Sequence, residues 1–277
     1  QVCGYAHIDV GLECDRCEGC DTLLSGEAVR QSDTLLEMPT VVARQSHRIT
    51  CDEEERLRRG YEVGTYIRFA AGSEGSLRRQ DASALSSEGR SLAALTYAPS
   101  ATLFSVNHGW RSSDELGFRL DLDSGRWLDR DGDGEASSGS QVRYYVQPFV
   151  RNTSNALLIR PEWGEEHDSD VFEPLLCTLR YALVAGLAAR YQVEPGELGS
   201  ELIGKGADQR ILIWESAEGG LGVLRRLVHD SDALPAIAST ALDIMHFEPE
   251  TGEDKRPPEN EEEGCARACY DCLLSYY

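Results

Sequence analysis

The residues of this sequence best suited to chemistry are three closely spaced cysteines near its carboxyl end. Cys265, Cys269 and Cys272 fall within eight positions, directly after an acidic, proline-containing segment from residue 250 to residue 263. Thiolates this close together can converge on one ion without ordering a long loop, and tetrahedral Zn²⁺ is their usual occupant. We therefore predict a zinc site here, with Cys177 and His246 as candidate fourth ligands.

A second group of cysteines lies at the opposite end of the sequence, at Cys3, Cys14, Cys17 and Cys20. Glu and Gly separate Cys17 from Cys20, and a glycine in this position lets backbone amides turn toward the sulfur atoms, as in a zinc knuckle. Cys3 followed by Gly4 has the form of the second half of another knuckle. Cys14 is then either a replacement ligand or a spare thiol. The alternative is a disordered, metal-free amino-terminal end.

Composition indicates an acidic globular protein with reduced thiols. The 277 residues are enough to bury a sizeable core, in one large or two modest domains. The chain has nine cysteines, an odd number, and a protein of this size does not need disulfides, so reduced thiols on metal in the cytoplasm are favoured. The formal net charge of −21 repels phosphate backbones at long range, so this chain alone is not expected to clamp nucleic acid strongly.

The sequence carries no signal for a membrane partner. No apolar run approaches the length of about eighteen residues that a membrane span needs, and no basic-then-apolar leader is present. The sequence begins at Gln1 and stops within the cysteine motif, and we interpret it as a piece of a longer protein.

The hydrophobic pattern predicts a mixed α/β (α+β) fold, in which a mostly antiparallel sheet precedes a helix-rich part. We expect a zinc-knuckle segment over residues 1–30, a β-rich region over 48–165, and a helix-rich region over 166–277 that the carboxyl-terminal cysteines close. Short runs rich in β-branched and aromatic residues predict strands at 63–69, 92–97, 102–106, 118–122, 142–146 and 155–159. Consecutive short strands with tight connections favour an antiparallel meander.

The second half of the sequence changes to a helical period. Leucines at every fourth position from Leu175 to Leu187, behind Asp170 and Glu173, predict a long buried helix over 171–192. A nearly continuous apolar run at 209–214 predicts a central strand, and helices are expected up to about residue 228 and over 234–245. The carboxyl-terminal cysteines share one helical face and are expected on a last helix or at its entry.

A glycine-rich turn follows the strand at 209–214. It contains Glu215, Glu218, Gly219, Gly220 and Gly222. Such turns often hold phosphate at a helix start, but the Lys-Ser/Thr ending of a nucleotide P-loop and the GxGxxG spacing are absent, and two carboxylates repel an anion. A structural role, in which the glycines let a helix pack tightly on the strand, is favoured. The alternative is a divalent-ion site made by Glu215, Glu218 and Asp208.

Taken with its neighbours, the segment from Cys269 to Tyr276 resembles a known family. It is similar to the carboxyl-terminal zinc-binding domain of MrfA-type superfamily 2 DEAD/DEAH helicases, which also occurs in DrmB of the DISARM anti-phage system. Residues 48–62, 155–159 and 213–222 share the likeness. The resemblance implies four cysteines around one zinc, of which only Cys265, Cys269 and Cys272 match here. It also implies a module attached to, or partnered with, an ATP-driven motor in DNA repair or phage defence.

We therefore predict a zinc-binding accessory domain that braces a helicase motor domain or subunit and helps it bind DNA. The sequence contains no Walker A lysine motif, no DExH box and no evident nucleophile–base pair, so no catalysis is expected in this chain. One alternative is a protein-binding scaffold whose acidic face docks a basic motor domain without affinity for DNA. Another is a metal-dependent nuclease or phosphodiesterase built on the carboxylates of the glycine-rich turn.

Overall fold

The structure is a computed structural model that describes residues 3–8, 15–25, 29, 32, 34–40, 60–111, 113–128, 139–162, 169–217, 219–256, 265, 268–269 and 272–273, with only the backbone at 169–171, 195 and 207. The strands are β1 (Leu35–Glu37), β2 (Tyr61–Arg68), β3 (Gln80–Leu85), β4 (Ser91–Trp110), β5 (Phe118–Asp121), β6 (Arg126–Leu128), β7 (Val142–Pro161), β8 (Leu198–Ile203) and β9 (Arg210–Glu215). The α-helices are α2 (Ser169–Tyr191), α3 (Val223–His229) and α4 (Ala233–Ile244), and short 3-10 turns are η2 (Ser73–Gly75), η3 (Pro195–Glu197) and η4 (Gly206–Asp208). The predicted mixed fold with a large antiparallel sheet is confirmed.

Two strands of 20 residues, β4 and β7, form the centre of the sheet. They pair antiparallel from Ala93 opposite Pro161 to Val106 opposite Phe149. Each strand changes neighbours along its length: β4 pairs first with β3 and then with β2, while β7 pairs with β5 and β1 before it reaches β9. The strand β8 completes the sheet beside β9, and β1 is the one strand among the described residues that runs parallel to its partner.

Each of these long strands was expected as two short ones, and that expectation is wrong. In β4 the pattern breaks at Pro99 and Ser100, where the pairing with β7 shifts register between Ala98 and Ala101. Ser100 has a left-handed backbone (φ 53°), and its amide donates to the Asn155 side chain at 3.1 Å. The polar break is therefore a bulge that the strand passes through, because β7 continues beside it.

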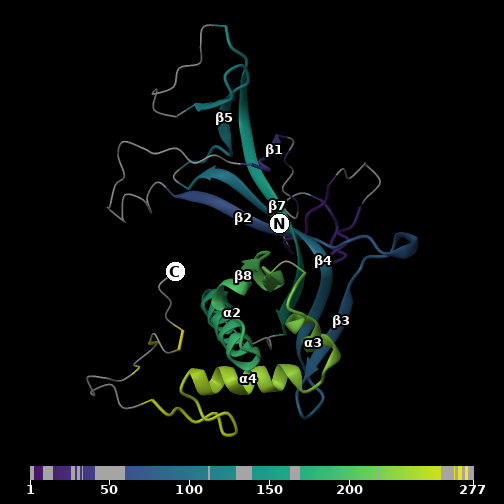
Figure 1. Cartoon of the computed structure of the whole chain (residues 1–277), viewed down its shortest axis with the longest axis vertical. Coiled ribbons are helices and arrows are strands. Elements are labelled where there is room, and N and C mark those ends of the chain that lie inside the picture. The colour runs from purple at the N-terminus through teal and green to yellow at the C-terminus, as the bar shows by residue number, and fades with distance from the viewer. Residues whose placement is uncertain are drawn as a thin grey trace.

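The alternation of side chains along the strands gives the sheet two buried faces. Leu157 and Ile159 of β7 point to one face, where Ile211 and Ile213 join a hydrophobic cluster that α2, α3 and α4 cover. Figure 1 shows these helices gathered on one side, while the part of β7 beside β5 extends away from them. The intervening residues point to the opposite face and pack against the amino-terminal cysteine segment in a second cluster that includes Cys3, Tyr5, Cys17, Ala156, Leu158 and Leu212.

The helix α2 agrees with the helix predicted over 171–192, but the expectation that no apolar run approaches the length of a membrane span is wrong for this helix. Residues Phe172–Tyr191 are long and apolar enough, by length and composition alone, to cross a membrane. In the fold, Leu176, Leu183 and Leu187 of this helix are buried in the cluster against the sheet. These contacts pack one face of α2 against the sheet.

The crossing of α2 and α4 generates a stability prediction. Gly186 lies where a Cβ would stand 2.6 Å from the carbonyl oxygen of Ile237 and 3.1 Å from the Cβ of Ala241. We expect Gly186→Leu to lower the free energy of unfolding by about 1–3 kcal/mol, because the helices must separate, although leucine favours a helix more than glycine does. Urea denaturation measures the change. Ala189→Leu, on the exposed face of the same helix, is the control and should change stability by less than about 0.5 kcal/mol; equal losses would contradict the packing argument.

Candidate metal centres

Four potential ligands come together near the carboxyl end of the described chain. The ligand atoms of His246, Cys265, Cys269 and Cys272 all lie within 4.8 Å of one another. The His246 Nε2 is 3.3 Å from the Cys269 Sγ, and the Sγ atoms of Cys265 and Cys272 are 3.8 Å apart. Ligand atoms around a tetrahedral zinc stand roughly 3.5–3.8 Å apart, given Zn–S and Zn–N bonds of about 2.3 and 2.0 Å. This donor set therefore fits Zn²⁺.

The histidine reaches the cysteines through an unusual backbone conformation. His246 follows α4 and has a left-handed backbone (φ 66°), which a histidine rarely adopts without support from its surroundings. The support comes from a small loop: the Lys255 amide donates to the His246 carbonyl at 2.8 Å, and Phe247 forms a bridge with Asp254. Arg256 lies over the Phe247 ring, 5.2 Å from its centroid. The loop thus holds the imidazole toward the cysteine segment.

The environment of the cysteines favours a thiolate at one of them. Burial opposes ionisation of Cys272, but the Cys269 amide donates to its sulfur at 2.9 Å and, with other hydrogen bonds, lowers the pKa of Cys272 below its usual range. Burial raises the pKa of the Cys265 thiol to about 12, and hydrogen bonds to Cys269 and Cys272 add to this effect. A zinc ion would replace the thiol protons and bind both sulfurs as thiolates, so that neither burial nor the neighbouring thiol would oppose ionisation.

The amino-terminal cysteines form a second group. The sulfur atoms of Cys3, Cys17 and Cys20 lie within 4.8 Å of one another, with Cys3 and Cys17 at 3.5 Å. The Gly19 amide donates to the Cys17 sulfur at 3.4 Å, which is the hydrogen bond expected of a knuckle. The hydrogen bond from Cys3 lowers the pKa of the Cys17 thiol to about 4 and raises that of Cys3. Three convergent thiols of this kind also fit zinc.

The segment that carries this second group is attached to the sheet. The Ile67 amide donates to the Gly4 carbonyl at 3.0 Å, and the Ala6 amide donates to the Ile67 carbonyl at 2.8 Å, so the segment runs parallel to β2. His7 lies beside the group, with its Nε2 3.3 Å from the Cys17 Sγ, but it does not belong to the set of ligand atoms that lie within 4.8 Å of one another. Cys14 lies outside the described residues.

The glycine-rich turn has a structural role, but the contacts that support α3 are those of Glu215 rather than close packing of Gly219 and Gly222. Glu215 is 1% exposed, and its carboxylate accepts hydrogen bonds from the Leu221 amide at 2.9 Å, the Leu224 amide at 3.1 Å and the Asn155 side chain at 3.1 Å. It therefore satisfies free amides at the start of α3. Gly220 has φ 75°, and a Cβ there would lie 2.5 Å from the Glu215 Oε2. Gly219 and Gly222 also have positive φ, at 83° and 72°.

The divalent-ion alternative for this turn is not supported. The oxygens of Glu215 are used within the protein, and Asp208 lies in η4, at the opposite end of β9 from Glu215. Glu218 lies outside the described residues. Among the described residues, Glu215 and Asp208 belong to no group of potential metal ligands.

Residues 179–273 match the family model described as the MrfA Zn-binding domain. This part of the chain is an MrfA-type zinc-binding domain. Its range contains His246 and the three carboxyl-terminal cysteines, and it excludes the amino-terminal group.

Comparison with solved structures adds one helicase. The crystal structure of the DUF1998 helicase MrfA bound to DNA is similar to this chain at 9% sequence identity and a TM-score of 0.37, over 72% of this chain and 24% of that one. The chain thus spans about a quarter of the length of that helicase. Among curated proteins, none matches this chain.

Within the MrfA-type domain, the structure decides two points on which the sequence was open or wrong. His246 stands in the fourth position, whereas Cys177, on α2, does not belong to the group. The described cysteines do not lie on a final helix: Cys265 and Cys269 are in irregular segments, and Cys272 lies in a turn closed by its own amide donating to the Cys269 carbonyl at 3.1 Å.

The contact of His7 with Cys17 was not predicted from the sequence. The position of His7 four residues after Cys3 and its place in a cysteine-rich segment were the available signals. They were weak, because the structure brings His7 to Cys17 only through the turn that contains Gly19.

The geometry predicts which variants lose zinc from the MrfA-type site. His246→Ala and Cys269→Ser should each weaken zinc binding at this site by at least about tenfold, since each removes a ligand and even outer contacts are worth that much. Competition against a chromophoric chelator measures the affinity. Cys177→Ser is the matched control and should leave the affinity unchanged, because this thiol lies outside the group. A loss with Cys177→Ser as large as that with His246→Ala would overturn the assignment of the fourth ligand.

The structural role of Glu215 predicts a stability loss without any loss of zinc. Glu215→Gln should lower the free energy of unfolding by about 1–3 kcal/mol, because the amides of Leu221 and Leu224 donate to different oxygens of Glu215 and the glutamine nitrogen can accept from neither. Glu201→Gln, a half-exposed position on the neighbouring strand β8, should cost less than about 0.5 kcal/mol. Urea denaturation with parallel zinc counting separates the two effects. An unchanged midpoint for Glu215→Gln would show that the carboxylate does not support α3.

Proposed function

We propose that this chain is a zinc-braced accessory domain of, or partner to, an ATP-dependent superfamily 2 DNA helicase, acting in the cytoplasm in DNA repair or anti-phage defence. The observation that carries the proposal is the coincidence of two findings. The MrfA Zn-binding domain model matches residues 179–273, and four ligands of zinc-binding chemistry converge within that range.

The ligand set supports a bracing role. Three thiols and one imidazole complete a tetrahedral shell and leave no position for water or substrate, which is the arrangement of structural zinc sites. The zinc would join the loop after α4 to the carboxyl-terminal segment, where few other described contacts connect them. A brace of this kind presents a fixed surface to a motor domain or subunit and to DNA.

A second candidate function is a scaffold that binds the motor without touching DNA. The formal net charge of −21 favours it, because an acidic surface attracts a basic motor and repels a phosphate backbone. The two candidates differ in one measurable property, which is the affinity of the isolated chain for DNA.

The test compares the zinc-loaded chain with the same chain after chelation and after reloading with zinc. Fluorescence anisotropy with labelled single-stranded and duplex DNA, at about 50 mM salt, measures binding where phosphate contacts are strong. We expect binding that falls at least tenfold on chelation and returns on reloading, because the metal orders the carboxyl-terminal segment. Salt-sensitive binding to a purified superfamily 2 motor without DNA affinity would replace the proposal with the scaffold. Binding to neither would overturn both.

A further inference from the structure

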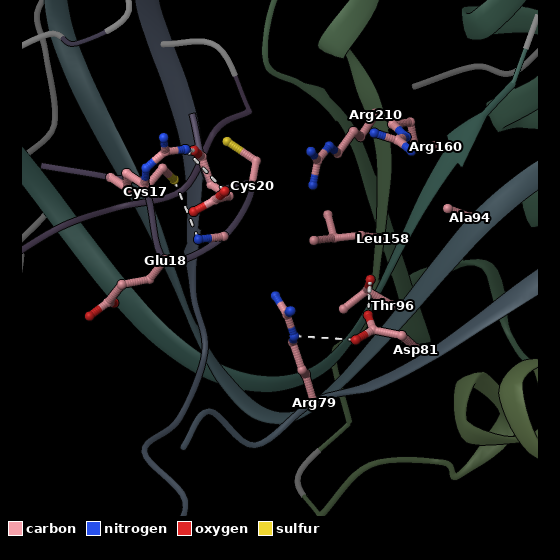
Figure 2. Close-up of a pocket in the computed structure, with 13 residues that line it drawn as sticks. Cys17, Glu18, Cys20, Arg79, Asp81, Ala94, Thr96, Leu158, Arg160 and Arg210 are labelled. Carbon is pink, nitrogen blue, oxygen red and sulfur yellow. Dashed lines mark hydrogen bonds and ion pairs between the residues drawn. The ribbon is translucent and has the colours of Figure 1, made fainter. Parts of the chain in front are cut away.

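A cavity with a volume of about 560 Å³ lies between the amino-terminal cysteine segment and the sheet. Cys17 and Cys20 contribute one wall, and Leu158 of β7 and Ala94 of β4 contribute the apolar part of the other. Figure 2 shows this space with side chains from both walls around it. None of the four carboxyl-terminal zinc ligands lines this cavity.

The lining of this cavity is rich in arginine, unlike the acidic chain as a whole. Four arginines line it, Arg16, Arg79, Arg160 and Arg210, in a chain whose acidic residues outnumber its basic ones by 48 to 27. They come from segments far apart in the sequence: the cysteine segment, the start of β3, the end of β7 and the start of β9. The fold therefore concentrates positive charge at one place on an acidic protein.

The acidic residues of the lining do not neutralise all of this charge. Asp21 pairs with Arg16 at 3.1 Å, and Asp81 pairs with Arg79 at 3.3 Å. The third acid, Glu18, accepts a hydrogen bond from the Tyr5 hydroxyl at 3.2 Å, and its carboxylate points away from the cavity in Figure 2.

Arg210 has no acidic partner among the described residues. Its Nε is buried and has no hydrogen-bond partner, and no ion pair joins it to the described part of the chain. Its neighbour Arg160 is half-exposed and pairs with Glu162 at 3.5 Å, away from the cavity lining. The charge of the Arg210 guanidinium is therefore not neutralised within the described residues, and an anion that enters the cavity would neutralise it.

The arrangement of the guanidinium groups indicates the shape of that anion. In Figure 2 the side chains of Arg79 and Arg210 extend into the cavity from opposite sides. Planar guanidinium groups donate in pairs to the oxygens of phosphate, and two such groups can share one tetrahedral phosphate between them. A volume of about 560 Å³ also leaves room for the nucleoside attached to it.

We propose that this cavity is a phosphate-binding site in which Arg79 and Arg210 hold the phosphoryl oxygens. The same chemistry is presented by the backbone of a nucleic acid and by a free nucleotide or polyphosphate. The nucleic-acid source rests on the proposed function, whereas the phosphate chemistry of the pocket does not. Binding is short-ranged and sensitive to salt, because the rest of the surface repels anions.

The experiment uses the zinc-loaded 277-residue chain and two probes, inorganic pyrophosphate by calorimetry and a labelled single-stranded oligothymidylate by anisotropy. Arg79→Gln and Arg210→Gln should each lower the affinity for both probes by about tenfold or more, since a hydrogen bond to a charged group is lost. Arg210→Lys keeps the positive charge but loses the paired donors of the guanidinium, so its affinity for the probes should lie between those of the wild type and of Arg210→Gln. Arg90→Gln, an exposed arginine in the β3–β4 turn that pairs with Glu88, makes the same charge change and should alter binding less than twofold.

The outcomes separate the pocket from the proposed function. Oligonucleotide binding that Arg79→Gln and Arg210→Gln weaken no more than Arg90→Gln would overturn the pocket and leave the proposed function intact. Pyrophosphate binding that depends on Arg210, with no affinity for the oligonucleotide, would support the pocket and count against the DNA role. Failure of both probes to bind the wild-type chain would overturn both. Zinc content and the circular dichroism spectrum of each variant confirm that it is folded.

Discussion

The antiparallel pairing of β4 with β7 is the constraint on which the rest of this structure depends. Because side chains alternate along each strand, this one register assigns Leu157 and Ile159 to the helices and Ala156 and Leu158 to the cysteine segment. A slip of one residue would exchange the two faces and bury neither correctly. The bulge at Ala98–Ala101 accommodates the polar break in β4 without ending the pairing.

The described metal ligands lie in segments outside the helices and strands. The amino-terminal segment joins β2 through one bridge and buries Cys3, Tyr5 and Cys17 against the sheet, and the described carboxyl-terminal residues form irregular segments and a turn. A metal ion would add further order to both segments. Structural zinc can contribute on the order of 10 kcal/mol to folding, which is comparable to the stability of a whole domain. The left-handed backbone of His246 is a local strain that such a contribution would offset.

The two ends of the strand β9 carry one charged residue each, and the fold gives these residues different surroundings. Glu215 ends the strand, and its oxygens are occupied by Asn155 and by amides at the start of α3. Arg210 begins the same strand, and its buried Nε meets no acceptor in the part of the chain that the structure describes. Both are single charges beside an apolar run in the sequence. The surroundings that the fold supplies make one a support for a helix and leave the other directed toward a cavity.

The sequence by itself determined part of the elements and the ligand types. Local patterns located β2, β5, β9 and the helices α2, α3 and α4 to within a few residues, whereas β1, β3, β6 and β8 were not predicted. Cysteine spacing, which is also a local pattern, identified the two ligand groups. Only the tertiary structure decided that His246 rather than Cys177 completes the carboxyl-terminal group, that paired short runs form single long strands, and that Arg79, Arg160 and Arg210 share one cavity. A coordination shell, a strand partner and a cavity lining are each set by distances through space between residues that the sequence places far apart.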